Sequence, residues 1–102
     1  MKIVLLALAV VAAGTVSAAA AEYTVVIDKM KFGPVPATLH PGDTIVWQNN
    51  DILRHSATAR DKSFDLDLPA KGSATLTIGA TGTVPFYCKF HPGMAGTLVI
   101  TP

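Results

Sequence analysis

Apolar residues recur at every second position along most of residues 22–102, and this period constrains the fold more than any other feature of the chain. Six segments show it, with turn-forming residues between them: 23–28, 44–48, 64–68, 75–78, 84–88 and 97–100. A period of two is that of a β-strand with one buried face. No stretch of this region has a convincing helical period. The chain is therefore predicted to be all-β, an antiparallel sandwich or barrel of short strands.

Residues 1–21 have a different pattern, which predicts a secretory signal peptide. Lys2 is followed by an uncharged apolar run over 3–13, and the segment ends in four alanines, Ala18 to Ala21. A basic start, a short apolar core and a small-residue end are the layout of such a leader. The predicted cut follows Ala21, with a cut one or two residues earlier as an alternative. An uncleaved membrane anchor is disfavoured, because the second half of the segment is alanine-rich and only weakly apolar.

The predicted mature domain, residues 22–102, is small and formally neutral. It holds seven basic and seven acidic residues, and a near-zero net charge without a basic run argues against nucleic acid as a partner. A domain of about 80 residues has a thin core and is often stabilised by a disulfide or a metal. Because Cys88 is the one cysteine of the chain, an intramolecular disulfide is excluded, and so is a four-cysteine zinc or iron–sulfur site.

The strongest local motif is CKFHPGM at residues 88–94, where a predicted strand runs into a Pro-Gly turn. It places a thiolate, an imidazole and a thioether on one tight loop, and this donor set selects copper over zinc or the hard cations. A trigonal site of two imidazoles and one thiolate needs a second histidine. His55 is the better candidate, because it opens a short strand predicted over 56–59. His40 precedes Pro41 in a predicted solvent-exposed turn.

Each of these side chains also has a purely structural interpretation. A lone cysteine is usually a small buried hydrophobe, and a methionine usually fills a core. The combination resists that interpretation, because an unpaired thiol in an exported protein is exposed to oxidation. A nucleophile–base pair of Cys88 and His91, or a zinc site of these two with His55, would make an enzyme. Neither uses Met94, so the chain is predicted not to be an enzyme. A metal-free interaction domain would leave the whole loop unexplained.

Three stretches of the sequence resemble the cupredoxins, the type 1 blue copper proteins: MKFGP at 30–34, PGDTIVWQNND at 41–51 and FYCKFHPGMAG at 86–96. The short spacing of the ligand loop resembles the form seen in amicyanin, whereas plastocyanin places two more residues before the methionine, and the chain looks most like the amicyanin and plastocyanin branch of the family. The resemblance implies a Greek-key antiparallel β-sandwich of about seven to eight short strands. It also implies one type 1 copper ion, with three strong equatorial ligands and a weak axial one; in this order, these are His55, Cys88, His91 and Met94.

The resemblance implies roles for residues around the metal as well. The backbone N–H of Ser56 is expected to donate a hydrogen bond to the Cys88 sulfur, which would stabilise the thiolate. Three aromatic side chains are expected in the core without a direct redox role: Phe32, Trp47 and Phe86.

The function that follows is that of a small periplasmic electron carrier, a monomer that is not inserted in the membrane once its leader is removed. Redox partners, such as a dehydrogenase, a cytochrome or an oxidase, are expected to dock transiently near His91, which Phe90 and Pro92 frame. The alternative is a periplasmic copper-binding or delivery protein that uses the same ligands without electron transfer.

Overall fold

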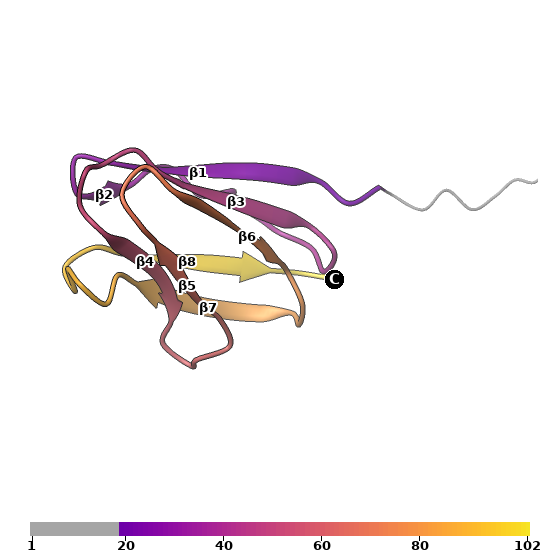
Figure 1. Ribbon diagram of the computed structural model, residues 1–102. Coiled ribbons are helices and arrows are strands. Elements are labelled where there is room, and N and C mark those ends of the chain that lie inside the picture. The colour runs from indigo at the N-terminus through magenta and orange to yellow at the C-terminus, as the bar shows by residue number, and fades with distance from the viewer. Residues whose placement is uncertain (1–18) are drawn as a thin grey trace, which may run out of the picture.

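The computed structural model describes residues 19–102, which form eight strands in two four-stranded sheets (Figure 1). The strands are β1 (Glu22–Asp28), β2 (Lys31–Phe32), β3 (Thr44–Asn49), β4 (His55–Ala59), β5 (Asp65–Leu68), β6 (Ser73–Thr77), β7 (Gly82–Tyr87) and β8 (Ala95–Ile100). The predicted all-β sandwich is confirmed. Residues 1–18 of the predicted leader lie outside the described residues. Within the described part, no helix is long and apolar enough to span a membrane.

The two sheets have the strand orders β2-β1-β3-β6 and β5-β4-β7-β8. Most neighbouring strands are antiparallel, as predicted, but β1 and β3 are parallel, in a register that runs from Glu22 opposite Thr44 to Ile27 opposite Asn49. A parallel pair needs a long connection that returns the chain to the same end of the sheet. Here that connection contains β2 and the segment 33–43, and within it Leu39 forms an isolated parallel bridge with Ile100.

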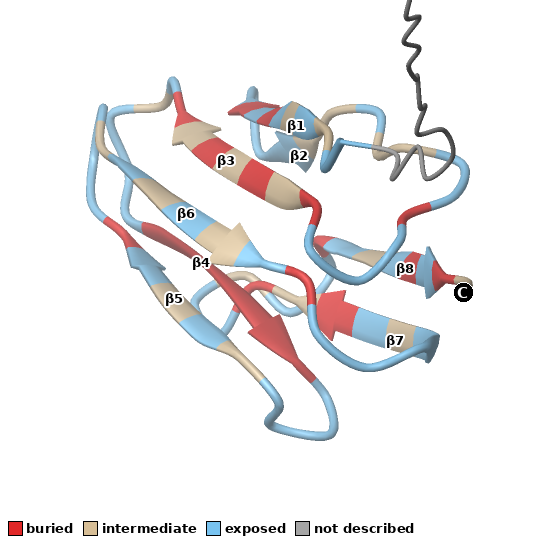
Figure 2. Ribbon diagram, turned by 90° about the vertical axis from the view of Figure 1, so that its right-hand side faces the viewer, coloured by how far each residue is buried: buried red, intermediate tan, exposed pale blue. Residues whose placement is uncertain are grey.

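Alternation along the strands places one face of each sheet in a common core. β3 shows this most clearly, since its buried positions are Ile45, Trp47 and Asn49, and the positions between them are only partly buried (Figure 2). Trp47 and Phe86 are fully buried and meet edge to face, with ring centroids 5.2 Å apart. Phe32 packs against both rings. Trp47 and Phe86 therefore occupy the core, as expected, and the partly buried Phe32 packs against it.

The ends of three strands bring the predicted ligands to one end of the sandwich. β4 begins with His55, β7 ends immediately before Cys88, and β8 begins immediately after Met94. The connection between β7 and β8 lies at the opposite end of the sandwich from the C-terminus (Figure 1). All five residues of β4 are buried, in the sequence HSATA, so His55 is fixed in a strand covered on both faces. We call this end of the sandwich the ligand end and the other end the far end.

Candidate metal centre

The centre is built around two fully buried side chains from opposite parts of the sequence, Cys88 and His55. The sulfur of Cys88 lies 3.8 Å from Nδ1 of His55. Cys88 is a free cysteine, and an imidazole nitrogen faces it where an ordinary core position would have an apolar neighbour. The structure thus brings together the thiol and the histidine that the sequence selected over His40.

The loop from Cys88 to Met94 is closed by its own backbone hydrogen bonds. The Cys88 N–H donates to the Met94 carbonyl at 3.0 Å, and the Met94 N–H donates to the His91 carbonyl at 2.8 Å. A third bond runs from the His91 N–H to the Cys88 carbonyl at 3.3 Å. The loop is therefore a compact turn, and the three donor residues that the motif supplies are held in one place by backbone geometry.

His91 packs against His55, and Met94 belongs to the buried core that contains Cys88. The ring of His91 is partly exposed and meets the ring of His55 with centroids 5.0 Å apart. Met94 is 6% exposed and belongs to the same buried cluster as Cys88. Among residues 19–102, no three or more His, Cys, Asp and Glu side chains are grouped in a way that could hold a metal ion. The assembled part of the centre is thus the sulfur–imidazole pair with the second imidazole against it. Met94 is tied to Cys88 through its backbone carbonyl.

Asp51 is a contact of the centre that the sequence did not reveal. One oxygen of its carboxylate lies 2.8 Å from Nε2 of His55. The same carboxylate accepts the backbone N–H groups of Lys29 at 2.8 Å and Met30 at 3.0 Å. Together with the His55 contact, these N–H groups lower the pKa of Asp51 below its ordinary value, the Met30 N–H most strongly. Because Nε2 is engaged by a carboxylate, Nδ1 is the ring nitrogen that faces the sulfur, an arrangement that recurs around metal-binding histidines.

The turn that supplies these N–H groups has an unusual backbone. Lys29 and Met30 both have positive φ, 53° and 63°. Residues other than glycine adopt this backbone conformation only at a cost in free energy. Two such residues in succession between β1 and β2 form the tight turn typical of hairpins. Asp51 satisfies both exposed N–H groups of this turn, so one carboxylate connects the hairpin to His55.

Asn49 holds the connection that carries Asp51. Its side chain is fully buried at the end of β3, donates to the carbonyls of Leu53 at 2.8 Å and Leu68 at 3.0 Å, and accepts the Asp51 N–H at 2.8 Å. A buried amide is stable only with its hydrogen bonds satisfied. Asn49 therefore fixes the path of the chain between β3 and His55, and with it the position of the Asp51 carboxylate.

Ser56 has a role different from the predicted one. Among the described residues, the structure records no hydrogen bond from its backbone N–H to the Cys88 sulfur. Its hydroxyl instead accepts the backbone N–H of Lys89 at 2.8 Å and meets the hydroxyl of Thr58 at 2.9 Å. The Lys89 ammonium reaches the carboxylate of Asp65 at 2.9 Å. Ser56 thus anchors the residue after Cys88 to the sheet, which positions the sulfur through the backbone.

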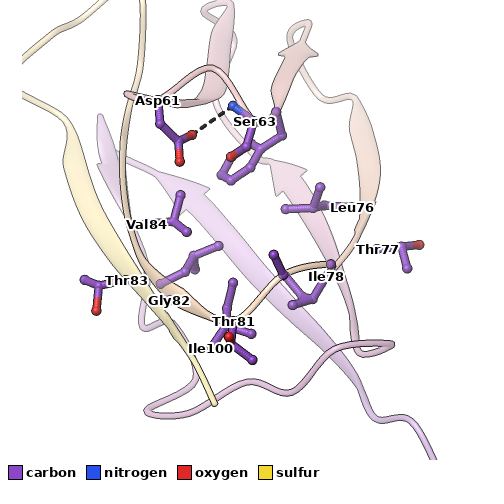
Figure 3. A pocket seen from close by; sticks show the side chains of 14 residues that line it. Asp61, Ser63, Leu76, Thr77, Ile78, Thr81, Gly82, Thr83, Val84 and Ile100 are labelled. Atoms are coloured by element: carbon purple, nitrogen blue, oxygen red, sulfur yellow. Dashed lines mark hydrogen bonds between the residues drawn. The ribbon is translucent and has the colours of Figure 1, made fainter. Parts of the chain in front are cut away.

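The far end of the sandwich contains a hollow. Its volume is about 310 Å³, and the side chains around it include Phe64, Leu76, Ile78 and Val84 (Figure 3). Among the described residues that line it, none is a histidine, cysteine or methionine. His40 also lies away from the centre: its side chain is 54% exposed and 3.7 Å from the carboxylate of Asp43. Soft donors are therefore concentrated at the ligand end.

The donor set of the ligand end suits copper. Thiolate and thioether sulfur with imidazole nitrogen favour copper over the hard cations, and the buried thiol already faces an imidazole whose other nitrogen is held by a carboxylate. The family comparison agrees with this chemistry: a model of the cupredoxin-like domain matches residues 2–100. The chain belongs to the cupredoxin-like family. Cupredoxins are typically copper proteins of electron transfer, and the relatives amicyanin and plastocyanin are electron carriers and not enzymes.

Individual relatives place this cupredoxin near amicyanin and plastocyanin. It is 28% identical to amicyanin of Paracoccus versutus over 80 residues, which cover 72% of this chain and 61% of the relative. It is 33% identical to plastocyanin of Nostoc punctiforme over 120 aligned positions, covering 95% of this chain and 86% of the relative. This cupredoxin thus spans somewhat less than two thirds of the length of that amicyanin.

Solved structures show the same fold. The Cu(I) form of a methionine-to-alanine mutant of amicyanin superposes with a TM-score of 0.66 at 26% identity, over 84% of this chain and 86% of that one. A purple cupredoxin from Nitrosopumilus maritimus superposes with a TM-score of 0.67 at 19% identity, over 76% of this chain and 98% of that one. At that lower identity the likeness concerns the fold alone.

Proposed function

We propose that this cupredoxin is an exported electron carrier that holds one type 1 copper ion through His55, Cys88, His91 and Met94. The observation that carries the proposal is the buried Cys88 thiol 3.8 Å from Nδ1 of His55. A buried thiol is ordinarily an inert hydrophobe. Its placement beside an oriented imidazole, on a loop that also presents a second imidazole and a thioether, matches the donors of a blue copper centre.

The protein residues divide the work of the centre. Copper, when bound, supplies one-electron chemistry by alternating between Cu(II) and Cu(I). His55, Cys88 and His91 would be the strong ligands, and Met94 would be the weak ligand that tunes the reduction potential. Asp51 holds the His55 ring in one orientation and tautomer. The backbone hydrogen bonds of the ligand loop keep the donors from rearranging, which favours rapid exchange of electrons.

A small apolar surface beside His91 is the proposed site of partner docking. Phe90 is 42% exposed on the ligand loop, and Ile52 and Leu53 are 80% and 48% exposed on the connection between β3 and β4. The guanidinium of Arg54 lies 4.7 Å from the centre of the Phe90 ring, so the two loops are neighbours. Small apolar patches suit weak, short-lived encounters. The proposed partners are redox proteins such as a dehydrogenase, a cytochrome or an oxidase, which dock on a monomer.

Export to the periplasm is part of the same proposal. It is supported by the leader pattern of residues 1–21. The fold adds support, because β1 begins only at Glu22, so removing the leader leaves all eight strands intact.

Protein-film voltammetry of the copper-loaded protein tests this function. We expect one reversible one-electron wave that persists over many cycles, and no wave for Cys88→Ser prepared in the same way. His40→Asn is the matched control, because it removes an exposed histidine away from the centre and should leave the wave unchanged. Loss of copper in each reduction would contradict the carrier function and favour the copper-delivery alternative.

A further inference from the structure

Asp43 is a buried acid at the far end of the sandwich that the copper centre does not use. Its residue is 4% exposed. One carboxylate oxygen accepts the backbone N–H of Ala21 at 2.9 Å, and the other accepts the backbone N–H of His40 at 2.9 Å. Within the described part of the chain, the recorded ion-pair partner of Asp43 is the largely exposed His40 ring at 3.7 Å. A buried carboxylate is costly unless it is paired or fully hydrogen-bonded.

Ala21 is already part of the fold, although the sequence assigns it to the leader. In addition to its N–H bond to Asp43, its carbonyl accepts the Thr44 N–H at 2.9 Å. This bond extends the parallel pairing of β1 with β3, which begins at Glu22 opposite Thr44. Ala19 and Ala20 are exposed and contribute no recorded hydrogen bond. The boundary between the folded chain and the preceding segment thus lies between Ala20 and Ala21.

The leader pattern allows a cut on either side of Ala21. A small residue is required at the last and third-last positions of the leader, and both Ala19 with Ala21 and Ala18 with Ala20 satisfy it. A cut after Ala21 would remove both hydrogen bonds of that residue and leave one recorded backbone donor on the buried carboxylate. A cut after Ala20 would keep both and convert the donor on Asp43 from a neutral amide into an ammonium group.

We infer that the mature protein begins at Ala21 and that its α-ammonium group forms an ion pair with the buried carboxylate of Asp43. A charge-assisted hydrogen bond of this kind is stronger than the neutral amide bond it replaces. The inference rests on the proposal that the leader is removed during export, and it deepens it by naming the cut and the group that receives the new charge.

The first test is the mass of the exported protein. The full chain of 102 residues, expressed with its own leader in a Gram-negative host, is purified from the periplasm and analysed by intact-mass spectrometry and N-terminal sequencing. Ala21 as the first residue is the expected result. A chain that begins at Ala19, Ala20 or Glu22 overturns the inference and leaves export standing. A retained leader overturns both, and neither result bears on the copper spectrum, which reports the carrier function separately.

The second test is the titration of the new α-amino group by NMR in the exported protein. The titratable groups that face it are Asp43, His40 and the adjacent Glu22. We expect its pKa to lie about one unit above the ordinary range of about 7.7–8.0. Asp43→Asn should return it to that range, and Asp61→Asn, an exposed acid elsewhere at the far end, should not. An ordinary pKa in the unmutated protein overturns the ion pair, whether or not Asp43→Asn folds.

The same pair predicts a direction for the stability of the exported protein. Because pairing raises the pKa of the ammonium in the folded state, its contribution is fully present below the ordinary α-amino range and is lost as the pH rises through the raised value. Chemical denaturation at pH 7 and pH 10 should therefore show a decrease with pH that Asp43→Asn reduces. An equal decrease in both proteins would contradict the pair.

Discussion

The two ends of this small sandwich differ in the side chains that they bury. At the ligand end, buried polar side chains are numerous and satisfied: Asn49, His55 and Ser56 are fully buried, and each has a hydrogen-bond partner within 3 Å. At the far end, a hollow of about 310 Å³ is lined by buried and partly buried apolar side chains and by the exposed connection between β6 and β7. Asp43 is the buried acid of that end, and it is held by backbone N–H groups.

This difference shows that the buried polar side chains are concentrated at the ligand end. Burying a polar side chain costs stability unless every hydrogen bond is made, and a fully satisfied network gives one defined arrangement in return. At the far end, the apolar side chains around the hollow leave space unfilled. The ligand end fixes an imidazole, a thiol and a loop, which is what a metal centre needs. The predictions below test this contrast, in order of decreasing effect.

The largest effect on stability is expected from Phe86→Ala. This substitution tests whether the packing of the core differs between the two ends. Phe86 is fully buried, packs against Trp47 and Phe32, and leaves no room for a side chain at Gly96. Its truncation should lower the free energy of unfolding by about 3–5 kcal/mol, measured by urea denaturation of the metal-free protein. Val84→Ala is the control, on the same face of β7 but beside the hollow, and should cost clearly less. Equal losses in the free energy of unfolding for the two variants would contradict a difference in packing between the two ends.

Asp51→Asn tests whether the polar network of the ligand end contributes to copper affinity. An amide keeps the size of the carboxylate but loses its charge, so it orients the His55 ring less firmly. We expect copper affinity to fall by about 10–100-fold, measured by competition with a chelator of known affinity. Asp61→Asn at the far end is the matched control and should bind copper as the unmutated protein does. Identical affinities for all three proteins would show that Asp51 has only a structural role.

The smallest effect concerns the anchor of the ligand loop. The Lys89 ammonium and the Thr58 hydroxyl lower the pKa of Asp65 below its ordinary value of 3.8. A lowered pKa means that the contribution to stability is present above that value and is lost as the pH falls through the folded-state pKa. Asp65→Asn should therefore flatten the acid side of the stability curve, by less than about 1 kcal/mol because the pair is largely exposed. Denaturation at pH 5 and pH 3 measures it, and a slope that Asp65→Asn leaves unchanged would contradict this assignment.

Much of the fold follows from local pattern, and the exceptions have physical causes. The alternation predicted β1, β3, β5, β6, β7 and β8, because each strand has one buried face. β2 was missed because Lys31–Phe32 is too short to show a period. The parallel pairing of β1 with β3 was also missed, since alternation identifies a strand but not its neighbour.

Some parts of the candidate metal centre could likewise be predicted from the sequence, and others could not. Cys88, His91 and Met94 lie within seven residues, so the sequence could name them, and they remain predictions as ligands together with His55. The contact between Asp51 and His55 depends on a turn fixed by Asn49 and on two N–H groups from the β1–β2 hairpin, and no local motif encodes such a meeting. Among the described residues, no hydrogen bond from the Ser56 N–H to the Cys88 sulfur is recorded; the Ser56 hydroxyl instead accepts the backbone N–H of Lys89, a contact between distant residues that no local motif encodes.

The most direct test of the central claim is the absorption spectrum of the exported protein after addition of Cu(II). If Cys88 is the thiolate ligand of a type 1 copper, an intense blue charge-transfer band should appear, disappear in Cys88→Ser, and persist in His40→Asn. Absence of the band in the unmutated protein, or its survival in Cys88→Ser, would contradict the assignment.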